Sequence, residues 1–166
     1  GDVVAEAIGN TASEAVSTAE GGGGGVSVAY VRAQASVGGS DTERQSVHVT
    51  VDGAQIRAGG DIELRAYNTG RARANIERGT NVSLSSVDVE ELPTFAWYST
   101  GVDVRGNAEL VSEGGSVNIL SEDAVSGESV ARGTTIGIGF NVNTTYGRNE
   151  AASENTINIA GLLDAY

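Results

Sequence analysis

Carboxylates are the residues of this sequence whose type and number could do chemistry. The chain has 166 residues, with 22 Asp and Glu against 10 Lys and Arg, and a net charge of -12. Two carboxylates on neighbouring strands can act as acid and base on a glycosidic bond. The candidates are Asp41, Glu43, Asp52, Asp88, Glu90 and Asp103. Their spacing follows no defined pattern, so we interpret them as solvated strand and turn residues and do not expect an enzyme.

His48 is the only histidine, and it lies between Val47 and Val49 at an outward position of an expected strand. The chain has no Cys. A zinc site needs several ligating side chains, and a triad needs a serine and an aspartate beside the histidine. The sequence offers His48 no such partners. The sequence therefore predicts no nucleophilic site.

Gly-Asp pairs raise the question of calcium, which glycine- and aspartate-rich β-rolls bind in their turns. The repeated motif G-G-x-G-x-D does not occur, and the Gly-Asp at Asp2 and at Asp61 becomes Gly-Ser at Ser116. Short polar side chains at such positions accept a backbone N–H and cap the turn. We expect this capping role and no cofactor, and calcium is an alternative without a supporting motif.

The segment PTFAWYS, Pro93 to Ser99, holds the only Pro and the only Trp of the chain. It departs from the pattern of the rest, which predicts a loop that could carry binding specificity. Aromatic faces stack on sugar rings and anchor protein interfaces. The candidate binding residues are Phe95, Trp97 and Tyr98. The alternative is that Phe95 and Trp97 cover an open flank of the fold.

Three similar stretches organise the chain: GDVVAEA from Gly1, GDIELRA from Gly60 and GSVNILS from Gly115. They recur about every 55 residues, a period typical of stacked repeats, and divide the chain into repeats 1–59, 60–114 and 115–166. Within each repeat, apolar and polar residues alternate with period two, as in half-buried strands. This predicts an all-β fold, a parallel β-helix (β-solenoid) with about three rungs in one segment.

Equivalent positions of the three repeats should stack in a common core. The predicted stacking residues are Val3, Ile62, Val117, Leu64, Ile119, Val28, Leu84 and Ile138.

The last repeat reads directly into another Gly-Asp-Val start, so we expect the chain to be one unit of a longer array, tandem or assembled head to tail. Unpaired strand edges at both ends would otherwise promote aggregation. The residues expected at these assembly ends are Gly1, Asp2, Val3, Ile159, Leu163 and Tyr166.

The acidic charge limits the partners. Phosphate groups are bound by clustered cations, so a net charge of -12 argues against nucleic acid. The sequence contains no apolar run of the length that spans a bilayer, about 18 residues or more. We expect no membrane insertion.

The stretches GVSVAYVRAQASV and HVTVDGAQIRAGGDIELRA resemble repeats of giant bacterial filamentous adhesins of the leukotoxin type, relatives of the filamentous-haemagglutinin class. The resemblance implies a parallel β-helix in a long extracellular or cell-surface protein, with no catalytic residue to carry over. The function expected is a structural repeat unit of a fibre or adhesin stalk whose partner is a further copy of itself. The alternative is a glycan-binding or polysaccharide-degrading β-helix, with glycans or a host or neighbouring cell surface as partner.

Overall fold

The chain folds into β-strands and the turns between them. The computed structural model describes residues 1–19, 25–40, 42–137 and 139–166, and within these ranges it contains no helix. The composition explains this, because Val, Ile and Thr favour extended backbone, while 24 glycines supply turns. The strands are β1 (Val3–Ala19), β2 (Val26–Arg32), β3 (Ala35–Val37), β4 (Gln45–Asp52), β5 (Gln55–Ala58), β6 (Ile62–Ser83), β7 (Ser85–Arg105), β8 (Glu109–Ser112), β9 (Val117–Gly137), β10 (Asn141–Ile159) and β11 (Leu162–Ala165).

Three sheets are built in the same way, because each repeat contributes to each of them in the same order. The first long sheet is β1-β6-β9, and the short sheet is β5-β8-β11. In the second long sheet β7 lies between β10 on one side and β2, β3 and β4 in succession on the other. Every pairing is parallel. The all-β, parallel-strand class predicted from the sequence is confirmed.

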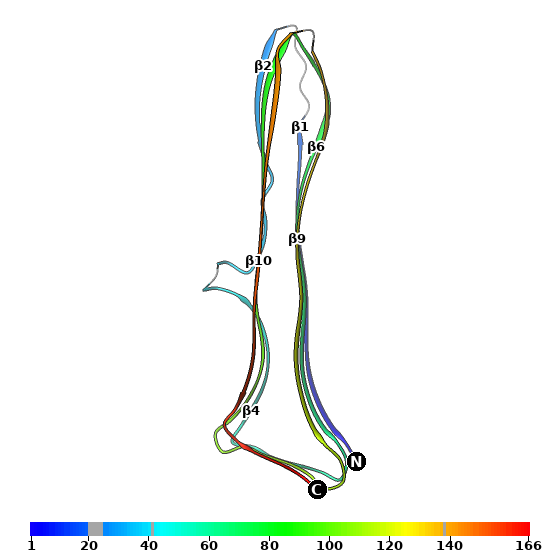
Figure 1. Cartoon of the computed structure of the whole chain (residues 1–166), viewed down its shortest axis with the longest axis vertical. Helices are drawn as coiled ribbons and strands as arrows, with labels where there is room; N and C mark the ends of the chain where they lie inside the picture. Colours follow the sequence, from blue (N-terminus) through cyan, green and yellow to red (C-terminus); the bar gives the residue numbers. More distant parts are fainter. Residues whose placement is uncertain (20–24, 41, 138) are drawn as a thin grey trace.

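The two long sheets run along the longest axis of the molecule, and the short sheet joins them at the end where both termini lie (Figure 1). Burial alternates strictly along β1 and for most of β7. One set of residues in each strand therefore points between the sheets, and the other set points outward.

The predicted stacking in the first sheet is confirmed. Val3 pairs with Ile62, which pairs with Val117, and Leu64 pairs with Ile119. Ile62 and Leu64 have no exposed surface, because the first and third repeats cover the middle one on both sides.

The predicted stacking of Val28, Leu84 and Ile138 is wrong where the structure describes it. Val28 does not pair with Leu84, and the two side chains are 75% and 49% exposed; Ile138 lies outside the described residues. The inward residue in β2 is instead Val31, at 8% exposure. Tyr30 and Val31 are adjacent and both apolar, so the alternating pattern could place either side chain in the interior. Packing against the opposite sheet buries Val31.

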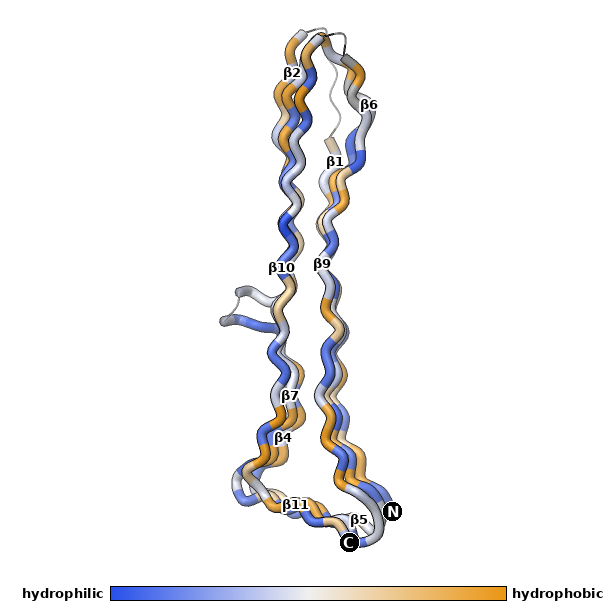
Figure 2. The backbone as a smooth tube through the Cα atoms, in the orientation of Figure 1, coloured by the Kyte–Doolittle hydropathy of each residue, from blue (hydrophilic) through white to orange (hydrophobic). Residues whose placement is uncertain are grey.

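The largest apolar cluster of the interior lies near the short sheet, and two smaller ones, around Ile76 and around Tyr98, lie farther along the long sheets. Figure 2 shows hydrophobic segments around β4 and the short sheet, at the end where both termini lie, and others at β2 near the opposite end. The apolar cluster near the short sheet contains Val49, Val51, Ala58, Ile62, Leu64, Ala66, Val102, Val104, Ala108 and Leu110. Farther from it, polar side chains such as Asn68, Thr94 and Thr100 are fully buried between the sheets.

The segment that departs from the repeat lies between β3 and β4, and its described residues, 38–40 and 42–44, project from the second long sheet (Figure 1). Gly38 has a φ of 78°, a conformation that favours glycine. The Ser40 hydroxyl accepts the N–H groups of Thr42 and Glu43. The insertion therefore lies in the first repeat, and not at Pro93 to Ser99 in the second.

Candidate functional site

Phe95 and Trp97 form a stacked pair on the outer face of β7. Their ring centroids are 5.0 Å apart and the ring planes differ by 6°. Tyr98 points the opposite way and is fully buried between the sheets, and this burial raises the pKa of its phenol. The predicted binding loop is therefore wrong, because the segment is regular strand. Of the three predicted binding residues, Phe95 and Trp97 lie on the outer face, where a ligand can reach them.

Pro93 is tolerated in this central strand because the neighbouring strand is interrupted beside it. β2 pairs with β7 as far as Glu91, and β3 resumes the pairing at Thr94. A proline opposite such a gap removes no hydrogen bond from the ladder. Pro93 therefore marks a break in the strand of the adjacent repeat. It does not mark a loop in its own repeat.

A groove of about 410 Å³ lies beside the aromatic pair on the outer face of the second sheet. Its lining combines aromatic rings with charged groups: Arg32, Glu91, Pro93, Phe95, Tyr146, Gly147 and Arg148. The Arg148 guanidinium lies 5.8 Å from the centroid of the Phe95 ring, within the range of a cation–π contact. The Nε atom of Arg32 lies 3.8 Å from a carboxylate oxygen of Glu91. The groove thus offers flat apolar surface together with hydrogen-bond donors and acceptors.

His48 has the partners that the sequence analysis did not expect. Its Nε2 lies 3.2 Å from the Ser99 hydroxyl, and its Nδ1 lies 3.4 Å from a carboxylate oxygen of Asp103. The side chains of His48 and Asp103 are 27% and 24% exposed. The expectation that His48 lacks the partners of a Ser-His-Asp arrangement is therefore wrong, because a serine and an aspartate lie beside its two ring nitrogens. The physical reason is the parallel register, which places residues from different repeats side by side.

The imidazole ring of His48 lies over Gly101, the residue opposite it on β7. A Cβ at Gly101 would lie 2.8 Å from His48 Cε1 and 2.9 Å from Nδ1, so any larger residue would displace the ring. Asp103 is held from the other side by Asn158, whose Nδ2 donates to it at 2.8 Å. The repeat alignment contained the signal for this cluster, because it places His48 opposite Gly101 with Ser99 and Asp103 two residues away on either side.

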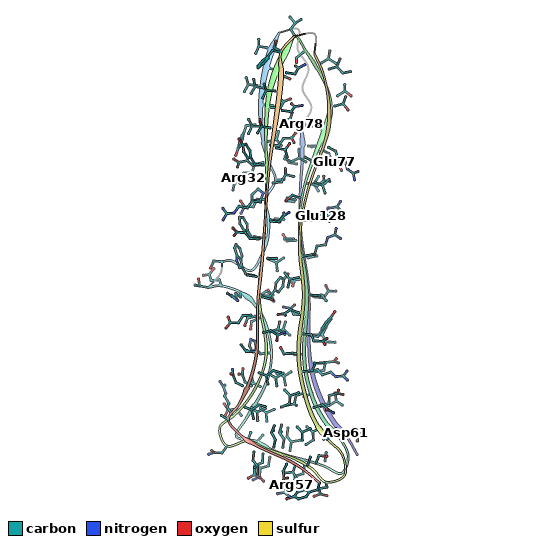
Figure 3. All side chains as sticks on the ribbon, in the orientation of Figure 1. Arg32, Arg57, Asp61, Glu77, Arg78 and Glu128 are labelled. Carbon is teal, nitrogen blue, oxygen red and sulfur yellow. The ribbon has the colours of Figure 1, made fainter. Side chains whose placement is uncertain are left out.

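Two of the six candidate carboxylates lie inside the molecule. Asp88 and Glu90 approach Arg78 from the opposite sheet, at 2.8 Å from Nη1 and 2.9 Å from Nε. The exposed fractions of the Arg78, Asp88 and Glu90 side chains are 7%, 1% and 13%. Figure 3 shows Arg78 between the two long sheets. The interpretation of Asp88 and Glu90 as solvated residues is therefore wrong, since Arg78 compensates their charges in the interior.

The other candidate carboxylates do not converge on one site. Asp52 pairs with Arg105 at 3.0 Å on the surface, and Glu43 lies in the projecting segment. Asp103 faces His48, and Asp41 lies outside the described residues. Among the described residues, no three His, Asp or Glu side chains are grouped to hold a metal ion.

Asp2 and Asp61 each accept a backbone N–H, as predicted, but the donor lies at the corner of the following repeat and not in their own turn. An Asp2 carboxylate oxygen accepts the N–H of Asp61 at 3.0 Å. Asp61 in turn accepts the N–H of Ser116 at 2.7 Å and its hydroxyl at 3.0 Å. The Ser116 N–H, followed by its hydroxyl, holds the pKa of Asp61 below its ordinary value of 3.8. The aspartates therefore link successive repeats.

Replacing Asp61 with Asn is expected to lower the melting temperature at pH 7 and to have a progressively smaller effect as the pH falls below 3.8. A depressed pKa stabilises the fold above the unfolded-state value, 3.8, and this stabilisation is lost as the pH falls through the folded-state pKa. Thermal unfolding followed by circular dichroism between pH 3 and 7 measures both. Glu122→Gln, which neutralises an exposed carboxylate, is the control. An Asp61→Asn effect that is equal at every pH would contradict the prediction.

The residues expected at the assembly ends lie in the two outer repeats. Val3 begins β1, and its N–H donates to the backbone oxygen of Asp61 at 2.8 Å. In the third repeat, Ile159 and Leu163 are 46% and 38% exposed, and Tyr166 is 80% exposed. The hydroxyl of Tyr166 donates to Asp164, which raises the pKa of Tyr166. The remaining predicted end residues, Gly1 and Asp2, accept hydrogen bonds from the backbone N–H groups of Gly60 and Asp61 in the second repeat.

No protein-family model matches the chain, and no curated protein or solved structure is significantly similar to it. Among the described residues, no helix has the length and apolar character needed to cross a membrane.

Proposed function

We propose that the chain is a stacking segment of a β-solenoid that forms the stalk of an extracellular fibre or adhesin. The observation that carries the proposal is the uninterrupted parallel register of the first sheet, in which 17 residues of β1 pair one to one with β6. Successive layers of such a sheet lie about 4.8 Å apart. A further layer of the same design can be added with the same geometry at either face.

The edges of the outer layers support stacking. Val3 donates its N–H to the backbone oxygen of Asp61, directly before β6, and in a parallel ladder alternate residues bond to opposite sides. The N–H groups of Val4, Glu6 and Ile8 therefore face away from β6, toward the open edge. On the opposite side, β9 presents its own edge over 21 residues. Long edges of this kind pair with another strand unless they are covered.

The corner hydrogen bonds support the same arrangement. Asp2 and Asp61 each accept a bond from the following repeat, and Ser116 occupies the equivalent position in the third repeat. Its hydroxyl can accept the N–H of an aspartate in a further layer. The partner is thus a second copy of this repeat design, in the same chain or in another. The extracellular location and adhesive role rest on the resemblance of the repeats to filamentous adhesins.

Replacing Glu6 with Pro is expected to block stacking while leaving the β1–β6 ladder intact. Proline removes the edge N–H and places its ring against the incoming strand, which should raise the critical concentration for assembly on the order of tenfold or more. Analytical ultracentrifugation and electron microscopy measure this. Glu6→Ala removes the same carboxylate but keeps the N–H, so it is the matched control. Equal assembly of both variants, or a wild-type chain that stays monomeric at millimolar concentration, would refute the proposal.

A glycan-binding role is the alternative function, and the groove beside Phe95 and Trp97 favours it. Trp97 is the only Trp, so its fluorescence reports on this surface alone. Titration with neutral and acidic polysaccharides should shift that emission. Phe95→Ala should weaken binding about tenfold, because the lost stacking contributes about 1.4 kcal/mol to the binding free energy. Phe140→Ala, at an exposed aromatic residue that is not part of the groove lining, is the control. Equal affinity of both variants would exclude the groove as the binding site.

A further inference from the structure

We propose that Ser99 is an activated nucleophile and that the outer face of the second sheet hydrolyses carboxylic esters. The inference rests on Ser99, His48 and Asp103 and goes beyond the proposed structural function. The three side chains come from two neighbouring strands, β4 and β7, and are brought together by the register that places His48 opposite Gly101.

The hydrogen bonds define a role for each residue. Asp103 lies 3.4 Å from Nδ1 of His48, and a carboxylate at this position selects the tautomer that carries its proton on Nδ1. The lone pair of Nε2 is then directed to the Ser99 hydroxyl at 3.2 Å. Ser99 therefore donates to His48, which is the arrangement of a nucleophile and its general base. Asp103 is a positioning residue.

The site is held in place by its neighbours. The missing side chain at Gly101 provides the space that the imidazole occupies. Asn158 fixes Asp103 from the third repeat at 2.8 Å. Each of the three repeats thus supplies part of the arrangement. Such support keeps catalytic groups in productive geometry without a conformational change.

The charge and shape near Ser99 indicate the class of substrate. Glu154 is in register with Ser99 on the adjacent strand, and Arg44 reaches Glu154 from the opposite side at 3.4 Å. The guanidinium therefore spans the strand that carries Ser99, where a cation stabilises a developing oxyanion. Trp97 occupies the next outward position along β7 and offers a flat surface to an aromatic or aliphatic group. An ester with a planar apolar portion fits this surface.

The proposed reaction has two steps. In the first, the Ser99 oxygen adds to the ester carbonyl while its proton passes to Nε2 of His48. The tetrahedral intermediate then expels the alcohol, which takes that proton, and leaves an acyl group on Ser99. In the second step, water attacks the acyl group and gives a proton to His48. Departure of the acid returns the proton to Ser99, and water is the only co-reactant besides the ester.

Covalent labelling tests the nucleophile directly. A fluorophosphonate probe should modify Ser99 with loss of fluoride, and peptide mass spectrometry identifies the labelled residue. Ser99→Ala should abolish the label, and His48→Ala should slow it by at least about 100-fold, the contribution of a general base. The control is Ser46→Ala, since Ser46 pairs with Ser99 on the same face. Its labelling and its turnover of p-nitrophenyl esters should match the wild type.

Two further measurements separate catalysis from structure. Added imidazole should restore labelling of Ser99 in His48→Ala, because it replaces the missing base. The chain contains one His, so nitrogen NMR of labelled imidazole reports on His48 alone. Asp103→Asn should shift its tautomer away from the Nδ1-protonated form and slow labelling.

The fold of every variant is checked by circular dichroism and Trp97 fluorescence. Labelling of the wild type no faster than that of Ser99→Ala would overturn the proposal. So would folded His48→Ala protein that labels at the wild-type rate. The Glu6→Pro assembly test is independent of both, so failure of the ester hydrolysis leaves the stacking function standing.

Discussion

Replacing Arg78 with Met is expected to lower the free energy of unfolding by about 3–5 kcal/mol, the cost of removing one partner from a buried ion pair. Arg78 contacts Asp88 at 2.8 Å and Glu90 at 2.9 Å, and its side chain is only 7% exposed. Met fills a similar volume but carries no charge. Two carboxylates would remain in the interior without a cation, and desolvated charge of this kind is costly. Urea denaturation followed by circular dichroism measures the loss.

The same substitution in an Asp88→Asn, Glu90→Gln background separates charge from packing. With both acids neutralised, Arg78→Met should cost no more than about 1 kcal/mol, the value of an ordinary hydrogen bond. The difference between the two backgrounds is the interaction free energy of the cluster. An equal loss in both would mean that Arg78 stabilises the fold through packing alone.

Replacing Gly70 with Ala is expected to destabilise the chain by about 1–3 kcal/mol, the usual cost of overpacking a core. A Cβ at Gly70 would lie 1.7 Å from the Tyr98 hydroxyl oxygen and 1.9 Å from the ring carbon that carries it. Tyr98 is fully buried, so the ring has no solvent into which it can move. Either Tyr98 leaves its rotamer or the two sheets separate locally. The melting temperature and the urea midpoint report the change.

Gly147→Ala is the matched control for this prediction. Gly147 lies in β10, and a Cβ there would have Ser129 Cβ as its nearest neighbour at 3.7 Å, an ordinary contact. Its replacement should be neutral or slightly stabilising, because alanine has fewer unfolded conformations than glycine. The double variant Gly70→Ala, Tyr98→Ala should lose less stability than the sum of its parts. Additive losses would show that the contact between Gly70 and Tyr98 is not the cause.

The sequence predicted the corners better than the strand faces between them. Asp2 and Asp61 each accept a backbone N–H as expected, because equivalent corners of successive repeats stack and bring the side chain of one corner beside the N–H of the next. Val28 was assigned to the wrong face, and Leu84 lies at the bend between β6 and β7. Local alternation supplies the period of a strand, while the opposite sheet decides which of its two phases is buried.

Two side-chain clusters were missed because each depends on packing between strands, which local alternation does not specify. Arg78 meets Asp88 across the interior, and His48 meets Ser99 and Asp103 across two repeats. The repeat alignment placed the residues of the second cluster in adjacent positions. It did not show that Gly101 leaves room for the imidazole ring, since that depends on the approach of three strands.

The sequence by itself determined that the chain is all-β, that its strands are parallel and that Val3, Ile62 and Val117 lie in one row, because a repeated alternating pattern favours the stacking of like residues. Only the tertiary structure decided which side of the second sheet faces the interior, where Trp97 and Tyr98 point, and which charges meet. The physical reason is that stacking within a sheet follows from equivalence between repeats. Packing between the two sheets joins residues that are not equivalent, and no periodicity in the sequence relates them.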